Sequence, residues 1–239
     1  MAHRWAYHPV MAHYTWLLFD ADGTLFDYEK AEAQALQATF EQFGQPYATS
    51  HLALYHPINE QLWLELERGL VTPAELQVRR FERLLDALGL HGDAQAFGTR
   101  YLQNLAGASA LLDGAEEVVR TLSRTYHLLV ITNGLKDVQR PRLQASPIGR
   151  YFDDVVISEE VGAAKPSRVF FDVAFARMGQ PDRRQVLLIG DSLSADIRGG
   201  IDYDLDTCWF NPRHLPRPEG LDIRYEIHAL PQLMNLLGE

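Results

Sequence analysis

Two aspartates, Asp20 and Asp22, follow directly after the apolar run WLLF at residues 16–19. Side chains two positions apart on an extended chain point to the same side. Two carboxylates side by side at the edge of a core repel each other and lose hydration. A chain that carries them there requires a partner that neutralises them. Gly23 comes next and allows a sharp backbone turn without side-chain bulk.

Other polar residues follow the later apolar runs in the same way. Thr132, Asn133 and Gly134 come after HLLVI (127–131), and Gly190, Asp191 and Ser192 come after QVLLI (185–189). Ligands of open α/β sheets bind beyond the carboxyl ends of the strands. If these ends converge, and if nearby loops or helix starts contribute Lys165 and Asp196, the sequence predicts one site that holds Asp20, Asp22, Thr132, Lys165, Asp191 and Asp196.

This set of side chains indicates a particular chemistry. Four carboxylates require a cation, and ligation by oxygen alone favours Mg²⁺ over zinc. A lysine and a hydroxyl suit the oxygens of a phosphoryl group. One aspartate can attack phosphorus, while the other gives a proton to the departing alkoxide and later takes one from water. Each motif alone is more typical of a turn or a helix cap, but their occurrence in order, each after its own strand, favours a site.

The elements that must position these residues alternate along the chain. Five apolar runs are predicted as strands, at 16–19, 127–131, 154–157, 185–189 and 207–210. Most are continuous, as in parallel strands covered on both faces. Helices are expected at 113–122, capped by Asp113, and at 167–179, ending at Gly179. The alternation predicts a doubly wound α/β fold with a parallel sheet.

Residues 27–108 interrupt this alternation with amphipathic helices and no convincing strand. In TPAELQVRRFERLLDALG (72–89), Thr72 is the expected cap, Pro73 the first helical residue and Glu75 the partner in a capping box. We therefore divide the chain into an N-terminal extension (1–15), a core domain (16–26 and 109–239) and a helical domain (27–108) inserted after the first strand.

Composition limits the partners. The 239 residues carry 22 Lys and Arg against 32 Asp and Glu, a formal net charge of -10. An acidic surface disfavours nucleic acid polymers and anionic membranes.

The single cysteine, Cys208, suits a reducing cytoplasm and is interpreted as a packed strand residue. His3, His8 and His13 are interpreted as part of a poorly ordered extension, not a metal site, and Met11 is a possible alternative start.

The four motifs together resemble those of the haloacid dehalogenase-like hydrolases: DADGTLF (20–26), ITNG (131–134), AKP (164–166) and GDSLSAD (190–196). The resemblance implies a Rossmann-like core, a helical cap that closes over the substrate, and Mg²⁺. It implies Asp20 as nucleophile and metal ligand, and Asp22 as acid/base that ligates the metal through its main-chain carbonyl. Thr132, Asn133 and Lys165 would bind phosphate and Asp191 would complete the metal site. Asp196 would act on the metal from outside its direct ligands, or through a water.

A narrower resemblance, carried by residues 59–82, 157–175 and 208–220, is to the pyrimidine 5′-nucleotidases of the same superfamily. The chain departs from them at Gly23, where Glu is expected, and at Arg140-Pro141, because proline is unfavourable inside the helix expected there. Candidates for base recognition in the cap are Trp63, Tyr55, Asn59 and Arg80. The favoured interpretation nevertheless assigns Trp63 to the cap core and Arg80 to a solvated face.

The sequence thus predicts a cytoplasmic, Mg²⁺-dependent phosphatase that acts on a small phosphate monoester, a pyrimidine nucleoside monophosphate, as a monomer or homodimer. A sugar-phosphate phosphatase similar to the acylneuraminate 9-phosphatases and a phosphomutase of the same fold remain alternatives. A non-catalytic binding module is disfavoured because all the reactive residues are present, and a dinucleotide-binding domain because no GxGxxG follows a strand.

Overall fold

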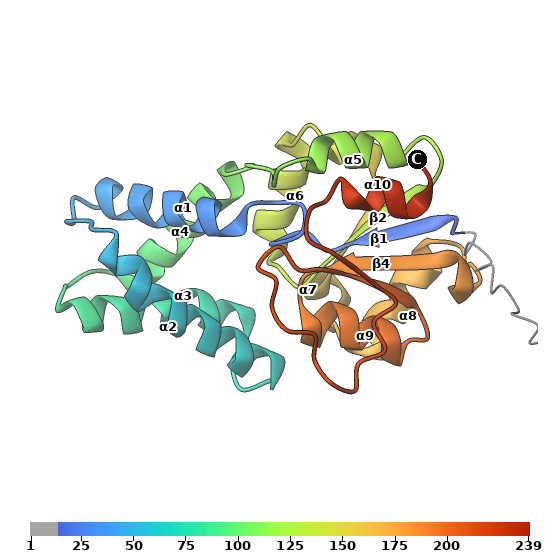
Figure 1. Ribbon diagram of the computed structural model, residues 1–239. Helices are drawn as coiled ribbons and strands as arrows, with labels where there is room; N and C mark the ends of the chain where they lie inside the picture. The colour runs from blue at the N-terminus through green and yellow to red at the C-terminus, as the bar shows by residue number, and fades with distance from the viewer. Residues whose placement is uncertain (1–13) are drawn as a thin grey trace, which may run out of the picture.

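The computed structural model describes residues 14–239. The predictions made for His3, His8, His13 and an alternative start at Met11 lie outside these residues. Within them, six strands form one parallel sheet in the order β3-β2-β1-β4-β5-β6 (Figure 1). The strands are β1 (Trp16–Phe19), β2 (His127–Thr132), β3 (Asp154–Ile157), β4 (Val186–Gly190), β5 (Asp206–Phe210) and β6 (Tyr225–Ile227).

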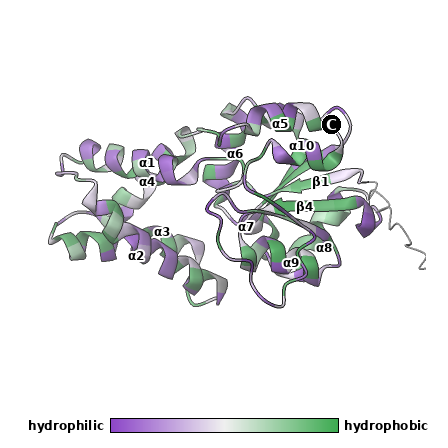
Figure 2. Ribbon diagram, in the orientation of Figure 1, coloured by the Kyte–Doolittle hydropathy of each residue, from purple (hydrophilic) through white to green (hydrophobic). Residues whose placement is uncertain are grey.

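The sheet is buried on both faces, which explains why its strands are continuously apolar (Figure 2). On one face, Leu17 and Phe19 of β1 pack with residues of α5 (Ala115–Leu122), α6 (Lys136–Ala145) and α10 (Gln232–Leu237). On the other face, Leu18 packs with residues of α8 (Arg168–Arg177) and with Tyr203, which follows α9 (Arg198–Asp202). The predicted doubly wound α/β fold is therefore confirmed.

The five predicted strands are present, with ends shifted by one residue at most. The sixth, β6, was not predicted because it is only three residues long. Cys208 is buried in β5, as expected, and its burial raises the pKa of the thiol to about 12.

The expected cap of α5 was wrong. The residue before the helix is Gly114, with φ +80°, and Asp113 does not cap it. A Cβ on Gly114 would approach the ring of Pro231 to 2.7 Å. The close passage of Pro231 therefore leaves room only for glycine at position 114, which also tolerates the left-handed turn that precedes the helix.

Four helices follow β1 and lie apart from the sheet (Figure 1): α1 (Tyr28–Gln42), α2 (Ser50–Glu67), α3 (Pro73–Leu88) and α4 (Ala94–Gly107). They enclose an apolar cluster of their own, with Phe40, Phe81 and Phe97 buried in it. The helix predicted at 72–89 is confirmed with its capping box: the Glu75 main-chain N–H donates to Thr72 Oγ1 over 3.2 Å, and the Thr72 N–H donates to Glu75 Oε2 over 2.8 Å. We propose that this cap domain extends over 27–108.

The two chain segments that join the cap to the core lie side by side. The main-chain N–H of Asp27 donates to the carbonyl of Ala110 over 3.0 Å, and that of Leu112 donates to the carbonyl of Leu25 over 2.9 Å. Phe26 and Leu111 form an antiparallel bridge between these bonds. The chain thus leaves and re-enters the core at one place.

Helix α6 keeps Pro141 in its interior, where the sequence led us to expect disruption. Proline in a helix interior costs about 3 kcal/mol. Burial of the apolar side chains of Val138 and Leu143 on this short helix contributes stability of the same order. Short elements complete the core: 3₁₀ turns at Gly149–Tyr151 and Arg183–Gln185, α7 (Ser158–Val161) and a π turn at Leu193–Ile197. Among residues 14–239, every helix is too short or too polar to span a membrane.

Candidate active site

The carboxyl ends of β1, β2 and β4 open into a cavity of about 310 Å³ beneath the cap. All seven residues that the sequence singled out line this cavity: Asp20, Asp22, Thr132, Asn133, Lys165, Asp191 and Asp196. Its other walls include Tyr28, Asn59 and Trp63 of the cap.

Lys165 lies at the centre of the site and is almost wholly buried, with 2% of its surface exposed. Its Nζ donates to Asp20 Oδ1 over 2.7 Å, to Asp196 Oδ1 over 2.6 Å and to the carbonyl of Ile131 over 2.9 Å. Burial alone lowers the pKa of a lysine, but the charges of Asp196 and Asp20 outweigh it here and raise the pKa of Lys165. Lys165 is therefore a fixed cation that is shared between two carboxylates.

One lysine leaves the site with excess negative charge. Burial and the neighbouring carboxylates raise the pKa of Asp20 well above its usual value and that of Asp191 to about 7. Asp20, Asp191 and Asp196 each offer an oxygen, and these oxygens lie within 4.8 Å of one another. Such a group of hard oxygen ligands fits a divalent cation, which would remove the repulsion among them.

Asp191 is positioned from three sides. The indole Nε1–H of Trp209 donates to its main-chain carbonyl over 3.0 Å, and the Thr24 hydroxyl lies 3.4 Å from Oδ1. Gly23, with φ +84°, passes so close that a Cβ there would lie 2.6 Å from Asp191 Oδ2. Glycine at position 23 therefore leaves room for the Asp191 carboxylate.

The side chains of Thr132 and Asn133 differ in the hydrogen-bonding groups that are left for a ligand. Thr132 Oγ1 accepts from the Gly134 main-chain N–H over 3.0 Å, so its hydroxyl hydrogen stays available to a ligand. The Asn133 amide is paired with the main chain of Lys165, donating to its carbonyl over 2.9 Å and accepting from its N–H over 2.8 Å. In this arrangement Asn133 holds the loop that carries Lys165.

Asp22 has partners that sequence reasoning missed. Gln139 Nε2 donates to Asp22 Oδ2 over 2.5 Å, and Arg142 forms an ion pair with Oδ1. Both partners are on α6 and are buried. Their spacing was visible in the sequence, because a polar residue and an arginine three positions apart lie on the same face of a helix. Polar pairs with that spacing usually face solvent, so the spacing did not indicate a buried contact.

The cap residues considered for base recognition have three different environments. Trp63 packs against the apolar cluster of the cap and also lines the cavity. Asn59 lines the cavity, and its amide donates to Glu32 over 3.1 Å. Tyr55 is buried in the cap core and does not line this cavity.

The assignment of Arg80 to a solvated face was wrong, because its side chain is buried. Its Nη1 donates to the hydroxyl of Tyr55 over 3.2 Å, and its guanidinium lies 5.5 Å from the centre of the Tyr101 ring. Arg80 is four residues from both Leu76 and Leu84, so it falls on the apolar stripe of α3. The hydrogen bond to Tyr55 and the cation–π contact with the Tyr101 ring stabilise the buried guanidinium there.

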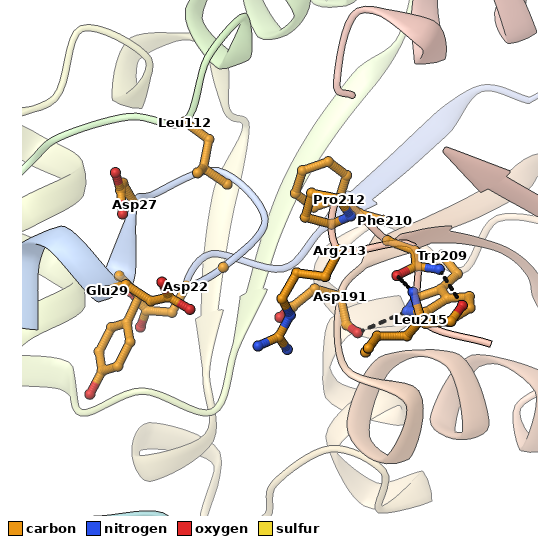
Figure 3. A pocket seen from close by; sticks show the side chains of 13 residues that line it. Asp22, Asp27, Glu29, Leu112, Asp191, Trp209, Phe210, Pro212, Arg213 and Leu215 are labelled. Atoms are coloured by element: carbon orange, nitrogen blue, oxygen red, sulfur yellow. Dashed lines mark hydrogen bonds between the residues drawn. The ribbon is translucent and has the colours of Figure 1, made fainter. Parts of the chain in front are cut away.

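A second cavity, of about 320 Å³, adjoins the first and shares Asp22 and Asp191 with it (Figure 3). Arg213, from the segment after β5, reaches into it. Asn211 shapes that segment: its side chain accepts from the Leu215 N–H and donates to the Leu215 carbonyl, each over 2.9 Å. The sequence stretch 208–220 was noted only for its resemblance, and nothing in it pointed to a cavity wall.

A parallel α/β sheet with a helical cap, and a buried lysine among carboxylates at its edge, define a capped hydrolase. The family model for haloacid dehalogenase-like hydrolases matches residues 14–204, and the chain belongs to that family. It is therefore an enzyme of the hydrolase class.

Three bacterial relatives span nearly the whole chain. The HAD-hydrolase YfnB of Bacillus subtilis is 37% identical over 95% of this chain and 97% of its own. A magnesium-bound crystal form of YfnB, which reveals interdomain movement, superposes with a TM-score of 0.89 over 95% of this chain and all of that one. The pyrimidine 5′-nucleotidases YjjG of Escherichia coli and PynA of Streptococcus pneumoniae are 34% and 35% identical, over 93% and 95% of this chain and 97% and 96% of their own.

Proposed function

We propose that this protein is a Mg²⁺-dependent phosphatase that hydrolyses pyrimidine nucleoside 5′-monophosphates through an aspartyl-phosphate. The observation that carries the chemistry is the Asp20–Lys165 pair, 2.7 Å apart, beside Thr132 at the edge of the sheet. The two pyrimidine 5′-nucleotidases among its relatives support the choice of substrate.

The reaction proceeds in two displacements. An Asp20 carboxylate oxygen attacks phosphorus and forms an acyl phosphate; the bond from phosphorus to the 5′ oxygen breaks, and that oxygen takes a proton from Asp22. In the second displacement, water attacks the same phosphorus, its proton passes to Asp22, and the bond to Asp20 breaks. Inorganic phosphate leaves, and both aspartates return to their initial states.

The chain's own cations and donors stabilise the phosphoryl group during these steps. Lys165 supplies a fixed positive charge beside Asp20, and the Thr132 hydroxyl supplies a hydrogen bond to an equatorial oxygen. The residues that would hold Mg²⁺ are Asp20, Asp191 and the main-chain carbonyl of Asp22, with Asp196 acting from outside the direct ligands or through a water. When bound there, Mg²⁺ supplies neutralising charge for the carboxylates and the phosphoryl oxygens.

Substrate selection belongs to the cap side of the cavity. The Trp63 ring is suited to stack on a flat base, and the Asn59 amide and Tyr28 hydroxyl are suited to hydrogen-bond to base or sugar. We propose that the enzyme works in the cytoplasm, on a small-molecule monoester, as a monomer or homodimer.

Phosphate release from a panel of monoesters, with Mg²⁺ and with EDTA, tests the proposal. The panel holds dUMP, UMP, dTMP, the purine monophosphates, several sugar phosphates and phosphoglycolate. Metal-dependent turnover concentrated on the pyrimidine nucleotides is expected. Turnover concentrated on sugar phosphates would keep the Asp20 chemistry and reject the nucleotidase assignment, and a requirement for a bisphosphate activator would indicate a phosphomutase.

A further inference from the structure

The Asp22 carboxylate is held at both oxygens by one helix. Gln139 Nε2 donates to Oδ2 over 2.5 Å, and the Arg142 guanidinium pairs with Oδ1. A carboxylate gripped at both oxygens has a single orientation, whereas a free aspartate side chain rotates among several.

Arg142 is unusual for an arginine that pairs with one carboxylate. It is completely buried, and its Nε and Nη2 have no hydrogen-bond partner among the described residues. Its guanidinium lies 5.1 Å from the centre of the Phe26 ring. Burial of a cation with unsatisfied donors costs stability, so packing alone does not explain an arginine here.

The chain leaves room for Gln139 beside Asp22. A Cβ on Gly134 would overlap the Gln139 side chain, so the glycine at 134 gives the amide the space to reach Asp22. The helix is fixed from two directions, because Leu135 and Val138 pack in the apolar cluster of the cap, while Leu143 packs in a core cluster of the sheet. Gln139 and Arg142 are therefore presented to Asp22 by a rigid support.

From this geometry we infer that Gln139 and Arg142 are positioning residues for Asp22, which hold its carboxylate where it exchanges a proton with the leaving oxygen. The inference rests on the proposed function, in which Asp22 is the acid/base. Neither residue needs to touch the substrate for this role. Loss of either one lets the Asp22 side chain rotate away from the reacting oxygen.

A comparison of two esters separates this role from a general structural one. An alkoxide such as the 5′ oxygen of dUMP requires a proton to leave, whereas the nitrophenolate of p-nitrophenyl phosphate leaves without one. The value of kcat/KM reports only the steps up to the release of the first product, the alcohol or the phenol. Water attack on the acyl phosphate comes later, so it does not mask the difference between the two esters. The variants are Gln139→Leu and Arg142→Met, with Asp22→Asn as the reference for a lost acid.

The matched control is Arg140→Gln. Arg140 lies on the same helix but is exposed and pairs with Glu160 on the surface. Its removal tests the effect of losing one charge from α6 without touching Asp22.

We expect Gln139→Leu and Arg142→Met to lower kcat/KM for dUMP about 10- to 100-fold and that for p-nitrophenyl phosphate less than threefold. Asp22→Asn should show the same split with a larger ratio, and Arg140→Gln should match the wild type on both esters. Gln139→Leu replaces a buried amide by an apolar side chain of similar size, so it keeps the test valid if Arg142→Met does not fold.

An equal loss on both esters, or no loss on either, would overturn the inference and leave the proposed function standing. If the wild type hydrolyses p-nitrophenyl phosphate but not dUMP, the alkyl ester from the panel with the highest turnover takes its place. Wild-type protein that hydrolyses no monoester would overturn the proposed function, and this inference with it.

Discussion

Asp20 and Asp22 lie two residues apart, yet their carboxylates have different surroundings. Asp20 is buried against Lys165 and the acidic cluster, whereas Asp22 is partly exposed and contacts α6. A nucleophile benefits from a fixed cation beside it, and a proton carrier benefits from contact with the cavity. The surroundings therefore support the separate roles proposed for the two residues.

Replacement of the nucleophile is the sharpest test at this scale. Asp20→Asn should lower kcat at least 10⁴-fold, because an amide cannot form the acyl phosphate. The side chain keeps its shape, and Lys165 keeps Asp196 as a partner, so the melting temperature should stay within a few degrees of that of the wild type. Turnover equal to that of the wild type would refute the mechanism.

Asp191 makes the metal-free protein sensitive to pH. Its folded-state pKa, about 7, lies above the value of 3.8 expected when unfolded, so the folded protein binds the proton more tightly. The contribution of Asp191 to stability is therefore full below pH 4 and is lost as pH rises through 7. In EDTA at pH 8, Asp191→Asn should raise the free energy of unfolding by about 2–4 kcal/mol.

The same comparison at pH 4 is the control for that prediction. There both proteins carry a neutral side chain at position 191, and their denaturant midpoints should converge. Mg²⁺ added at pH 8 should stabilise the wild type more than the variant, because in the proposed metal site the folded state holds it through this carboxylate. If Asp191→Asn were less stable than the wild type in EDTA at pH 8, the ionised Asp191 carboxylate would not destabilise the folded protein, and the prediction would be wrong.

At the scale of elements, the strands and the polar residues after them were predictable because the sheet is covered on both faces. Continuous apolar runs mark such strands, and their parallel arrangement brings Asp20, Thr132 and Asp191 to one edge. The first turn of α3 was predictable because the capping box is local.

What the sequence did not reveal depends on contacts distant along the chain. Pro231 leaves room only for glycine at position 114. The buried Arg80 contacts Tyr55 and Tyr101, and α6 holds the Asp22 carboxylate. Periodicity carries no information on such pairings. The helix that contains Pro141 likewise persists because its packing outweighs a local penalty.

The capping box of α3 gives a prediction about stability. Thr72→Val keeps the branched shape but removes the hydroxyl that accepts from the Glu75 N–H. We expect a loss of about 1 kcal/mol, or a fall of about 2–4 °C in the melting temperature. Thr72→Ser retains the hydroxyl and should leave the melting temperature unchanged; a Thr72→Val variant as stable as Thr72→Ser would show that the box contributes nothing.

Helix α2 gives a prediction about specificity. Trp63→Ala removes the ring that faces the cavity, so KM for the preferred nucleotide should rise at least 10-fold. Inhibition by inorganic phosphate, which needs only the core residues, should be unchanged and serves as the control. An unaltered KM would assign Trp63 to the packing of the cap alone.

At the scale of the whole molecule, the active site is shared between two bodies of different construction. The sheet edge supplies the proposed reactive residues, and helices α1 and α2 of the cap supply Tyr28, Asn59 and Trp63 on the opposite wall. Each body has its own apolar cluster, and α6 contributes to both. The two proposed roles, catalysis at the core and substrate selection by the cap, are therefore coupled through the packing of α6.

The paired connections at Phe26 and Leu111 have a consequence for engineering. Because the chain exits and returns across a single bridge, a short link between these two segments would reconnect the core after removal of the whole insert. Leu135 and Val138 would then lose the apolar cluster that covers them, so a replacement module must have neighbouring ends and must also cover these two side chains. We expect a helical module that meets both conditions to be graftable at this junction, as an exchangeable cassette for testing new substrate ranges.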